Sequence, residues 1–331
     1  MADVAVRKGG NASWASAGLV LAALASFALL LQLLNPARVA GAQNFLLIFS
    51  SLLIEAVPFV LLGAVVSAAI EVFVPTRFFE KLTDLPRPLQ LPAAALTGFA
   101  FPVCECGSVP VARRLAAKGL TPSAAVTFML AAPILNPVVI ASTFVAYRGR
   151  DSLWTMVVGR AGLGLVAAVA VGWVVANKSK AELLRPRPGD AEHHHHDHSR
   201  SGAFFAPLSG DFLFMGRYLI LGAVVAAALQ TFVPQSVIGS VAGTPVVDLL
   251  AMMLLAFVLS LCSESDAFVA ASFVQFGPGA QLAFLVFGPM VDTKLGFLYS
   301  ATFTRGFFRT VVVSVAAVTL AGTLWIEVMA G

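Results

Sequence analysis

The chain has 331 residues, of which 59% are hydrophobic and 11% are charged, and its formal net charge is +4. A soluble domain carries about 25% charged residues, so a soluble globule of this composition would lack the polar groups to cover its surface. The composition excludes an ordinary cytosolic enzyme, a nucleic-acid-binding protein and a disordered protein, and it predicts an all-α integral membrane protein.

Nine apolar segments are long enough to be transmembrane helices. They lie near residues 15–35, 44–74, 91–112, 122–147, 152–176, 211–233, 246–273, 279–302 and 306–328. The first follows Arg7 and Lys8, and it is too long for the apolar core of a cleaved signal peptide. We therefore expect residues 1–43 to hold an additional, uncleaved span.

A charged stretch rich in proline and glycine, residues 177–207, separates two halves, 44–176 and 208–331. This composition predicts a solvated, poorly ordered linker. It contains a run of histidines that are candidate weak collectors of divalent metal: His193, His194, His195, His196 and His198. An unselected solvated loop explains the run equally well.

The two halves resemble each other. Gly63-Ala64-Val65-Val66 matches Gly222-Ala223-Val224-Val225 at an offset of 159, and Cys104 matches Cys262 at an offset of 158. Further along, Pro133 and Asn136 match Pro289 and Asp292 at an offset of 156. Internal repeats with interrupted helices at matching positions are typical of transporters, and the interruptions indicate the substrate site.

Lys and Arg residues distinguish two topologies. If all nine segments cross the membrane, the loops on the two sides carry equal numbers of basic residues. If 91–112 and 246–273 are re-entrant, fifteen basic residues face one side, and only Arg38, Arg148 and Arg150 face the other. The second distribution fits the rule that cytoplasmic loops are positively charged, with a cytoplasmic N-terminus. Each half then has an odd number of crossings, which predicts inverted repeats. Both segments are also long enough to cross the membrane, so the alternative that each crosses it as a broken helix stays open.

Segment 91–112 contains a polar interruption, Cys104-Glu105-Cys106, followed by Ser108. Pro102, Gly107 and Pro110 prevent a regular helix from continuing through it. In unwound backbone the two thiols can converge, and paired thiols suit a soft metal or metalloid. An intramembrane carboxylate is energetically costly, so Glu105 is a candidate functional residue.

Segment 246–273 contains a second polar cluster: Cys262, Ser263, Glu264, Ser265 and Asp266. If the two interruptions face each other, Cys104, Cys106 and Cys262 form a three-thiol set suited to a pyramidal trivalent arsenical or a thiophilic cation. Single membrane cysteines also serve as small packing residues. The sequence leaves open whether Cys262 is a ligand or such a packing residue.

Two further interruptions occur at matched positions, Ala132-Pro133-Ile134-Leu135-Asn136-Pro137 and Gly288-Pro289-Met290-Val291-Asp292-Thr293-Lys294. Proline kinks at Pro133, Pro137 and Pro289 free carbonyls to coordinate a ligand, and Asn136 and Asp292 add polar side chains. The alternative is that these prolines only kink the helices and that the breaks contact no ligand. Lys294 is expected to pair with Asp292.

Other charges also fall within apolar segments. Arg160 and Arg217 are expected near segment ends, from which they can extend to the membrane surface. Glu55 lies well inside its segment, and it either carries protons or pairs with one of these arginines.

The four interruptions, from Phe101-Pro102-Val103-Cys104-Glu105-Cys106-Gly107-Ser108-Val109-Pro110 to Gly288-Pro289-Met290-Val291-Asp292, resemble the signature of the YraQ/ArsP-type predicted permeases over roughly residues 44–328. The resemblance implies a bacterial inner-membrane permease. Some members of that family are implicated in efflux of trivalent organoarsenicals, and many have no assigned substrate. The family's cysteine motif maps onto Cys104 and Cys106, whereas the histidine run is not part of its pattern.

We therefore expect a secondary-active exporter of a thiophilic substrate. The alternative is a carrier of divalent transition metals that uses Glu105, Glu264, Asp266 and Asp292 as ligands. The sequence has no HExxH, GxSxG or haem-binding CxxCH motif and no P-loop, so we expect neither an enzyme nor a resident cofactor. Expected partners are the lipid bilayer, the transported species and protons, with a homodimer or a partner subunit left open.

Overall fold

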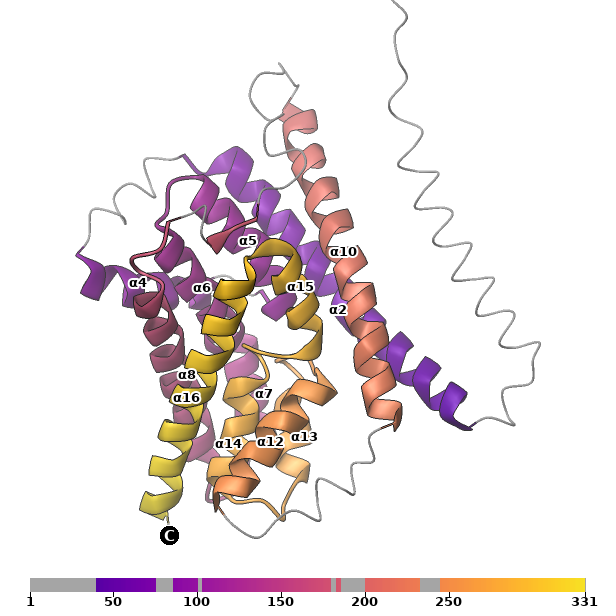
Figure 1. Cartoon of the computed structure of the whole chain (residues 1–331), viewed down its shortest axis with the longest axis vertical. Coiled ribbons are helices and arrows are strands. Elements are labelled where there is room, and N and C mark those ends of the chain that lie inside the picture. Colours follow the sequence, from indigo (N-terminus) through magenta and orange to yellow (C-terminus); the bar gives the residue numbers. More distant parts are fainter. Residues whose placement is uncertain are drawn as a thin grey trace, which may run out of the picture. The chain divides into compact units, whose positions relative to one another are not determined.

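A computed structural model of the chain describes residues 40–75, 86–100, 103–179, 183–185, 200–232 and 245–330 (Figure 1). These residues are almost entirely helical, and their one recorded β-bridge joins Leu184 to Phe303. The predicted all-α membrane fold is confirmed. The predicted span 15–35, Pro102 and the histidine run lie outside the described residues.

Twelve helices are described, and they carry the labels of Figure 1. They are α2 (Ala40–Phe73), α4 (Arg87–Ala100), α5 (Glu105–Ala117), α6 (Pro122–Leu135), α7 (Pro137–Ala146), α8 (Leu153–Val174), α10 (Arg200–Phe232), α12 (Pro245–Leu259), α13 (Asp266–Ser272), α14 (Pro278–Phe287), α15 (Thr293–Thr302) and α16 (Arg305–Ala330). Helix α10 begins at Arg200, so the end of the predicted linker is helical. The span in this helix, Phe204–Phe232, is longer than the predicted 211–233.

Five helical stretches among the described residues are long and apolar enough to cross a membrane. They are Gly41–Phe73, Pro122–Ala146, Leu153–Val174, Phe204–Phe232 and Arg305–Glu327. The remaining apolar segments are broken into shorter helices. The breaks fall where the sequence places its polar interruptions, between α4 and α5, α6 and α7, α12 and α13, and α14 and α15.

Helices α4 and α5 form a hairpin whose two ends lie at the same end of α6. The hydroxyl of Thr121, which caps α6, donates to the Gln90 side chain near the start of α4 (3.3 Å). At the far end of α4, a Cβ placed on Gly98 would lie 2.8 Å from Ala132 Cα. Helix α4 thus runs beside α6 in the same direction and α5 returns, which is the re-entrant path.

Helices α12 and α13 form the corresponding hairpin in the second half. The C-terminal part of α12 lies against the end of α14, where a Cβ on Gly288 would approach the Ala256 side chain to 3.4 Å. The chain after α13 returns to the start of α14, since the Gln281 amide donates to the Phe273 carbonyl (3.0 Å). This hairpin therefore opens toward the end of the molecule where α14 begins.

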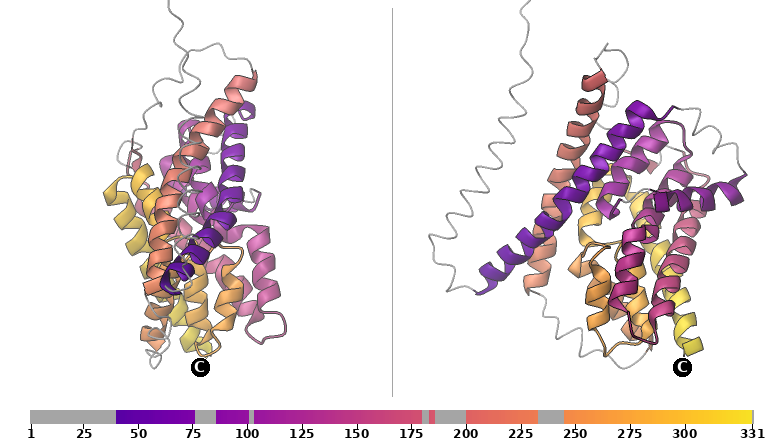
Figure 2. Two further views of the ribbon diagram at one scale, coloured as in Figure 1. Left: turned by 90° about the vertical axis from the view of Figure 1, so that its right-hand side faces the viewer. Right: turned by 180° about the vertical axis from the view of Figure 1, so that it is seen from behind.

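The two hairpins open toward opposite ends of residues 48–331. The end of α7 meets the start of α14 through the hydrogen bond from the Tyr147 hydroxyl to Gln281 (2.8 Å). The ends of α5 and α15 meet the chain near Arg185, whose carbonyl accepts from Arg113 and whose amide donates to Thr302. The pairs α6–α7 and α14–α15 consequently run in opposite directions. This is the arrangement of inverted repeats. Figure 2 shows the helices from two further sides.

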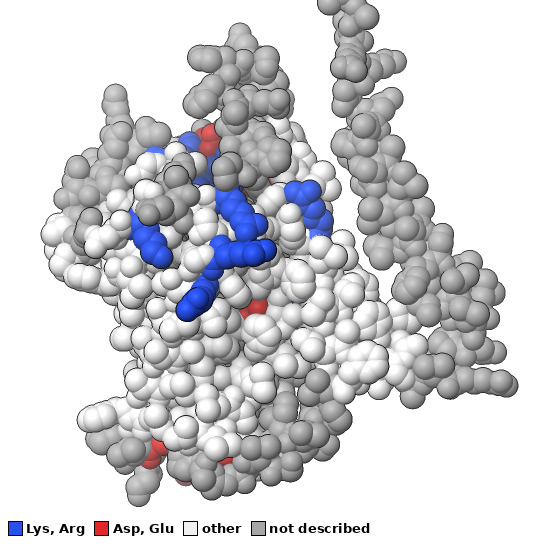
Figure 3. All heavy atoms as spheres, viewed as in Figure 1, with Lys and Arg blue, Asp and Glu red and all other residues white. Residues whose placement is uncertain are grey.

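Basic side chains gather at one end of this unit. The ends of α5 and α8 and the start of α16 carry Arg113, Arg114, Lys118, Lys178 and Arg305. Figure 3 shows Lys and Arg collected over the upper part of the visible face. At the other end, the turn between α7 and α8 carries Arg148 and Arg150. The asymmetry agrees with the re-entrant topology.

Candidate functional site

The first polar break positions its side chains at the N-terminus of α5. Cys104 is the residue before the helix and is extended (φ −75°, ψ 177°), and Glu105 and Cys106 occupy the first turn. The Ser108 hydroxyl donates to the Glu105 carbonyl (2.9 Å), which satisfies a backbone acceptor inside the helix. All four side chains are buried. Pro110 lies in the second turn of α5, and because proline has no N–H it cannot donate to the Cys106 carbonyl.

Gly107 has a packing role. A Cβ placed on Gly63 of α2 would lie 2.4 Å from Gly107 Cα, so the two backbones touch. Small residues allow such close approach between membrane helices. The contact between the two glycines therefore fixes how closely α5, and with it the cysteines at its start, packs against α2.

The second break is the loop of residues 260–265 between α12 and α13. It starts at Ser260, whose φ of +51° is the one positive value among the described residues other than glycine. The loop then closes on itself, because the amides of Ser265 and Asp266 both donate to the Cys262 carbonyl (3.0 Å each). Cys262 and Ser263 are held buried, facing the start of α5.

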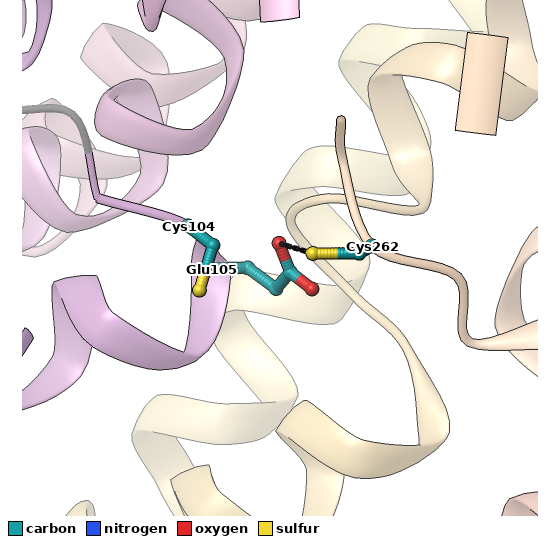
Figure 4. Close-up of side chains that lie close together, drawn as sticks. All are labelled: Cys104, Glu105 and Cys262. Carbon is teal, nitrogen blue, oxygen red and sulfur yellow. Dashed lines mark hydrogen bonds between the residues drawn. The ribbon is translucent and has the colours of Figure 1, made fainter. Parts of the chain in front are cut away.

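The two breaks meet. One ligand atom each from Cys104, Glu105 and Cys262 lies within 4.8 Å of the others, as Figure 4 shows for these side chains. All three cysteines are free thiols. Two thiols, Cys104 and Cys262, and the Glu105 carboxylate thus form one buried cluster, and Cys106 is buried in the first turn of α5.

Glu105 occupies the centre of this cluster. Its Oε2 accepts from the Ser263 hydroxyl (3.0 Å) and backbone amide (3.4 Å), and it lies 4.0 Å from Cys262 Sγ. Its Oε1 has no hydrogen-bond partner in the described part of the chain and lies 3.8 Å from Lys294 Nζ. The carboxylate thus faces thiols on one side and an ammonium group on the other.

Glu264 and Ser265 extend the cluster toward α2. Glu264 Oε2 accepts from Cys262 Sγ (2.8 Å) and from the Ser263 hydroxyl (3.3 Å). The Ser265 hydroxyl donates to Glu55 Oε1 (2.8 Å), which brings Glu55 beside the second break. The sequence predicts that Glu55 either carries protons or pairs with Arg160 or Arg217. The predicted pairing is wrong, because the contacts of these described residues do not join Glu55 to either arginine.

Asp266 and Arg160 form a buried ion pair, Nη2 to Oδ2, at 2.7 Å. Arg160 is 2% exposed, so the expectation that its side chain extends to the membrane surface is wrong. It is retained in the interior because Thr143 and the Ser263 carbonyl also accept from its guanidinium. Arg217, in contrast, stacks on the rings of Phe214 and Tyr218 at the helix surface.

Asn136 and Asp292 occupy equivalent positions in the two halves. Each caps the second member of a broken helix: Asn136 Oδ1 accepts from the Val138 amide (2.9 Å) and Asp292 Oδ1 from the Leu295 amide (2.6 Å). Pro133 lies in the last turn of α6, Pro137 begins α7, and Pro289 lies between α14 and α15. These residues stop one helix and start the next, so the geometry assigns them a structural role.

Sequence reasoning missed three residues of the cluster. Lys294 was expected to pair with Asp292, but its recorded ion pair is with Glu105 in the other half. Arg160 and Lys294 could have been found by treating every intramembrane charge as a candidate. Ser260, whose hydroxyl accepts from the Lys294 amide (3.1 Å), has no signal in the sequence that distinguishes it from other serines.

A family model described as a predicted permease, ArsP_1, matches residues 41–328. The chain belongs to this permease family. The chain is 42% identical over 284 residues to the "UPF0718 protein YcgR" of Bacillus subtilis (85% of this chain, 96% of the relative). It is 37% identical over 254 residues to a "Putative two-component membrane permease complex subunit" of Streptococcus mutans (75% of this chain, 83% of the relative). No solved structure matches.

The family description identifies a membrane transporter rather than an enzyme. Together with the apolar helices, it makes the chain a multi-pass membrane permease. The buried cluster of thiols and carboxylates at the meeting point of the two hairpins is the candidate substrate site of the permease.

Proposed function

We propose that the permease is a secondary-active exporter of a thiophilic substrate, and that trivalent organoarsenicals are the leading class. The observation that carries this proposal is the convergence of Cys104 and Cys262 from two separate hairpins, with Cys106 buried in the adjacent first turn of α5. Thiolates bind soft metals and metalloids in preference to hard cations. Two converging thiols and a third nearby match a pyramidal centre that accepts up to three sulfur ligands.

The chemistry balances without a redox change. A species RAs(OH)2 condenses with two thiols: two As–O bonds and two S–H bonds break, two As–S bonds form, and two waters leave. Arsenic remains trivalent and the net charge does not change. The reverse reaction with water releases the substrate, so the same site can load and unload.

The inverted hairpins supply a plan for alternating access. Each places a broken segment at the centre and opens toward one end of the molecule. Rocking of one repeat against the other would expose the cluster to each side in turn. We propose that the basic end faces the cytoplasm of a bacterial inner membrane and that the N-terminus lies on that side. Protons are the proposed driving ion.

Binding of phenylarsenous acid by the purified protein tests this proposal. Wild-type protein is compared with Cys104→Ser, Cys106→Ser and Cys262→Ser, and correct folding is checked by size-exclusion chromatography. We expect Cys104→Ser and Cys262→Ser to fold and to bind more weakly by about tenfold or more, because the arsenical condenses with two thiols and these two lie together; Cys106→Ser should weaken binding less. Folded cysteine variants that bind as tightly as wild type would overturn the proposal.

A divalent transition-metal carrier is the second candidate. It is favoured by Glu105, whose carboxylate lies among the thiols and completes a donor set typical of zinc sites. It predicts that Glu105→Gln abolishes zinc binding and that arsenicals do not compete with zinc. The histidine run would act as a cytoplasmic collector, and its deletion would reduce zinc uptake into the site at low concentration.

We also propose that the permease assembles with a second component, because the Streptococcus mutans relative is named as a subunit of a two-component complex. Affinity purification of the tagged full chain from its own cells, after chemical crosslinking, tests this. A second copy of the chain as the only crosslinked partner would indicate a homodimer instead.

A further inference from the structure

Lys294 places a positive charge beside the thiol cluster. It is the second residue of α15, it is 2% exposed, and its Nζ lies 3.8 Å from Glu105 Oε1. That oxygen has no hydrogen-bond partner among the described residues. The ammonium group is therefore the counter-ion that the second half of the molecule supplies to the site carboxylate of the first half.

The backbone of Lys294 is held tightly. Its amide donates to the Ser260 hydroxyl (3.1 Å), in the left-handed turn that begins the second break. On the other side, a Cβ placed on Gly222 of α10 would lie 2.8 Å from Lys294 Cα, so the two backbones are in contact. The loop and α10 therefore fix the position of the Lys294 backbone, from which the buried side chain reaches Glu105.

A divalent cation and Lys294 would compete for the same carboxylate. The candidate donors Cys104, Glu105 and Cys262 lie within 4.8 Å of one another, so a cation bound among them would contact Glu105 and lie close to the ammonium. Two like charges in a buried site repel strongly, since the interior screens them poorly. Transfer of Glu105 to the metal would also take away the carboxylate that lies 3.8 Å from the buried ammonium of Lys294.

We propose that Lys294 is a specificity-determining residue that excludes divalent cations from the thiol cluster and admits neutral trivalent species. This inference rests on the proposed function, because it names the property that separates the two candidate substrates. A neutral dihydroxy arsenical condenses with two thiols and releases only water, so it adds no charge beside the ammonium. A divalent cation brings two positive charges next to the ammonium, and these are offset only if two buried thiols release their protons; it also draws on the Glu105 carboxylate that pairs with Lys294.

Removal of the ammonium should convert the cluster into a cation site. Without it, two thiols and the Glu105 carboxylate remain within reach of one another, and Glu264 adds a second carboxylate next to Cys262. Sulfur and carboxylate donors in this number are sufficient to hold zinc. The exclusion therefore depends on one side chain of the described site.

The test compares zinc binding and phenylarsenous acid binding by full-length wild-type protein, Lys294→Met and Lys294→Arg in detergent. Methionine keeps the length of the side chain and removes the charge, whereas arginine keeps the charge. We expect zinc to bind Lys294→Met more tightly than wild type by about tenfold or more, and Lys294→Arg to resemble wild type. Arsenical affinity should change less than zinc affinity in both. Equal zinc affinities in Lys294→Met and wild type would overturn the inference.

A second measurement needs no variant. Phenylarsenous acid bound to wild-type protein should protect Cys104 and Cys262 from alkylation, and excess zinc should neither protect them nor displace the arsenical. Zinc that displaces the arsenical from wild-type protein overturns the inference even if Lys294→Met does not fold. Failure of wild-type protein to bind the arsenical would instead overturn the proposed function, so the two failures are distinguishable.

Discussion

Arg160 and Asp266 form an ion pair of 2.7 Å between side chains that are both almost fully buried. It joins α8 of the first half to the start of α13, directly after the loop that carries Cys262. Removing one partner of a buried pair leaves an uncompensated charge, so we expect Asp266→Asn to lower the stability by about 3–5 kcal/mol. Thermal unfolding in detergent, followed by intrinsic fluorescence, measures the loss.

The double variant Arg160→Met/Asp266→Leu separates structure from binding. Apolar residues of similar size often replace a buried ion pair without loss of stability. We expect the double variant to unfold near the wild-type temperature and to bind phenylarsenous acid. A folded double variant that no longer binds the substrate would show that Asp266 is a ligand, as the sequence suggested, rather than a structural partner.

The positions of the helix breaks could be predicted from the sequence because prolines and polar clusters are local signals. The inverted direction of the repeats also followed from the distribution of Lys and Arg. The meeting of Cys104 with Cys262 could only be stated conditionally, since it depends on the packing of two hairpins that are far apart in the sequence. Once both breaks are known to lie centrally, the cluster follows from the internal repeat.

Residue roles were less predictable than residue positions. Asn136 and Asp292 are polar residues at helix breaks, and the sequence cannot distinguish a cap from a ligand. Arg160 was misplaced because its distance from the helix start suggested access to the surface, whereas carboxylate and carbonyl partners from the other half keep it inside. Partners contributed by a distant segment are not visible in the local pattern.

A cluster of ion pairs joins α2, α5 and α10 at the basic end. Arg114 lies 3.3 Å from both Glu71 and Asp211, and the Ser67 hydroxyl donates to Asp211 (2.8 Å). Because α5 carries Arg114 near one end and Glu105 at the other, we expect a movement at this end to shift the side chains of the candidate substrate site. We expect this cluster to stabilise the closed state of that end of the permease.

The variant Arg114→Ala tests whether this cluster of ion pairs holds the basic end of the permease closed. In vesicles whose basic end faces outward, we expect labelling of the site cysteines by a membrane-impermeant maleimide to become about threefold to tenfold faster, because weak ion pairs hold the closed state. Arg113→Ala is the matched control, since the neighbouring side chain donates to the Arg185 carbonyl and lies outside the cluster. Equal labelling rates in the two variants would contradict a closing role.

The contact between Gly222 and Lys294 predicts that α10 does not tolerate a side chain at this position. A methyl group on Gly222 would meet the Lys294 backbone at 2.8 Å, whereas one on Gly216 of the same helix would have nothing within 4 Å. We expect Gly222→Ala to lower the unfolding temperature by about 3–10 °C, as overpacking does, and Gly216→Ala to leave it unchanged or slightly higher. Similar temperatures for both variants would show that α10 can move away from α15.

Capping and charge can be separated at Asp292. Asparagine keeps an oxygen that can accept from the Leu295 amide and removes the negative charge, whereas alanine removes both. Since Glu105 remains as the counter-ion of Lys294, we expect Asp292→Asn to fold and to bind phenylarsenous acid nearly as wild type. Asp292→Ala should lose about 1–2 kcal/mol of stability with the cap.

Asn136→Asp and Asn136→Ala form the matched pair in the first half, where the equivalent cap accepts from the Val138 amide. Thermal unfolding and arsenical binding are measured for all four variants. If both residues act as caps, the two alanine variants lose stability and the two isosteric variants keep substrate binding. A well-folded Asp292→Asn that fails to bind the arsenical would instead make this carboxylate a part of the substrate site, because only its charge has been removed.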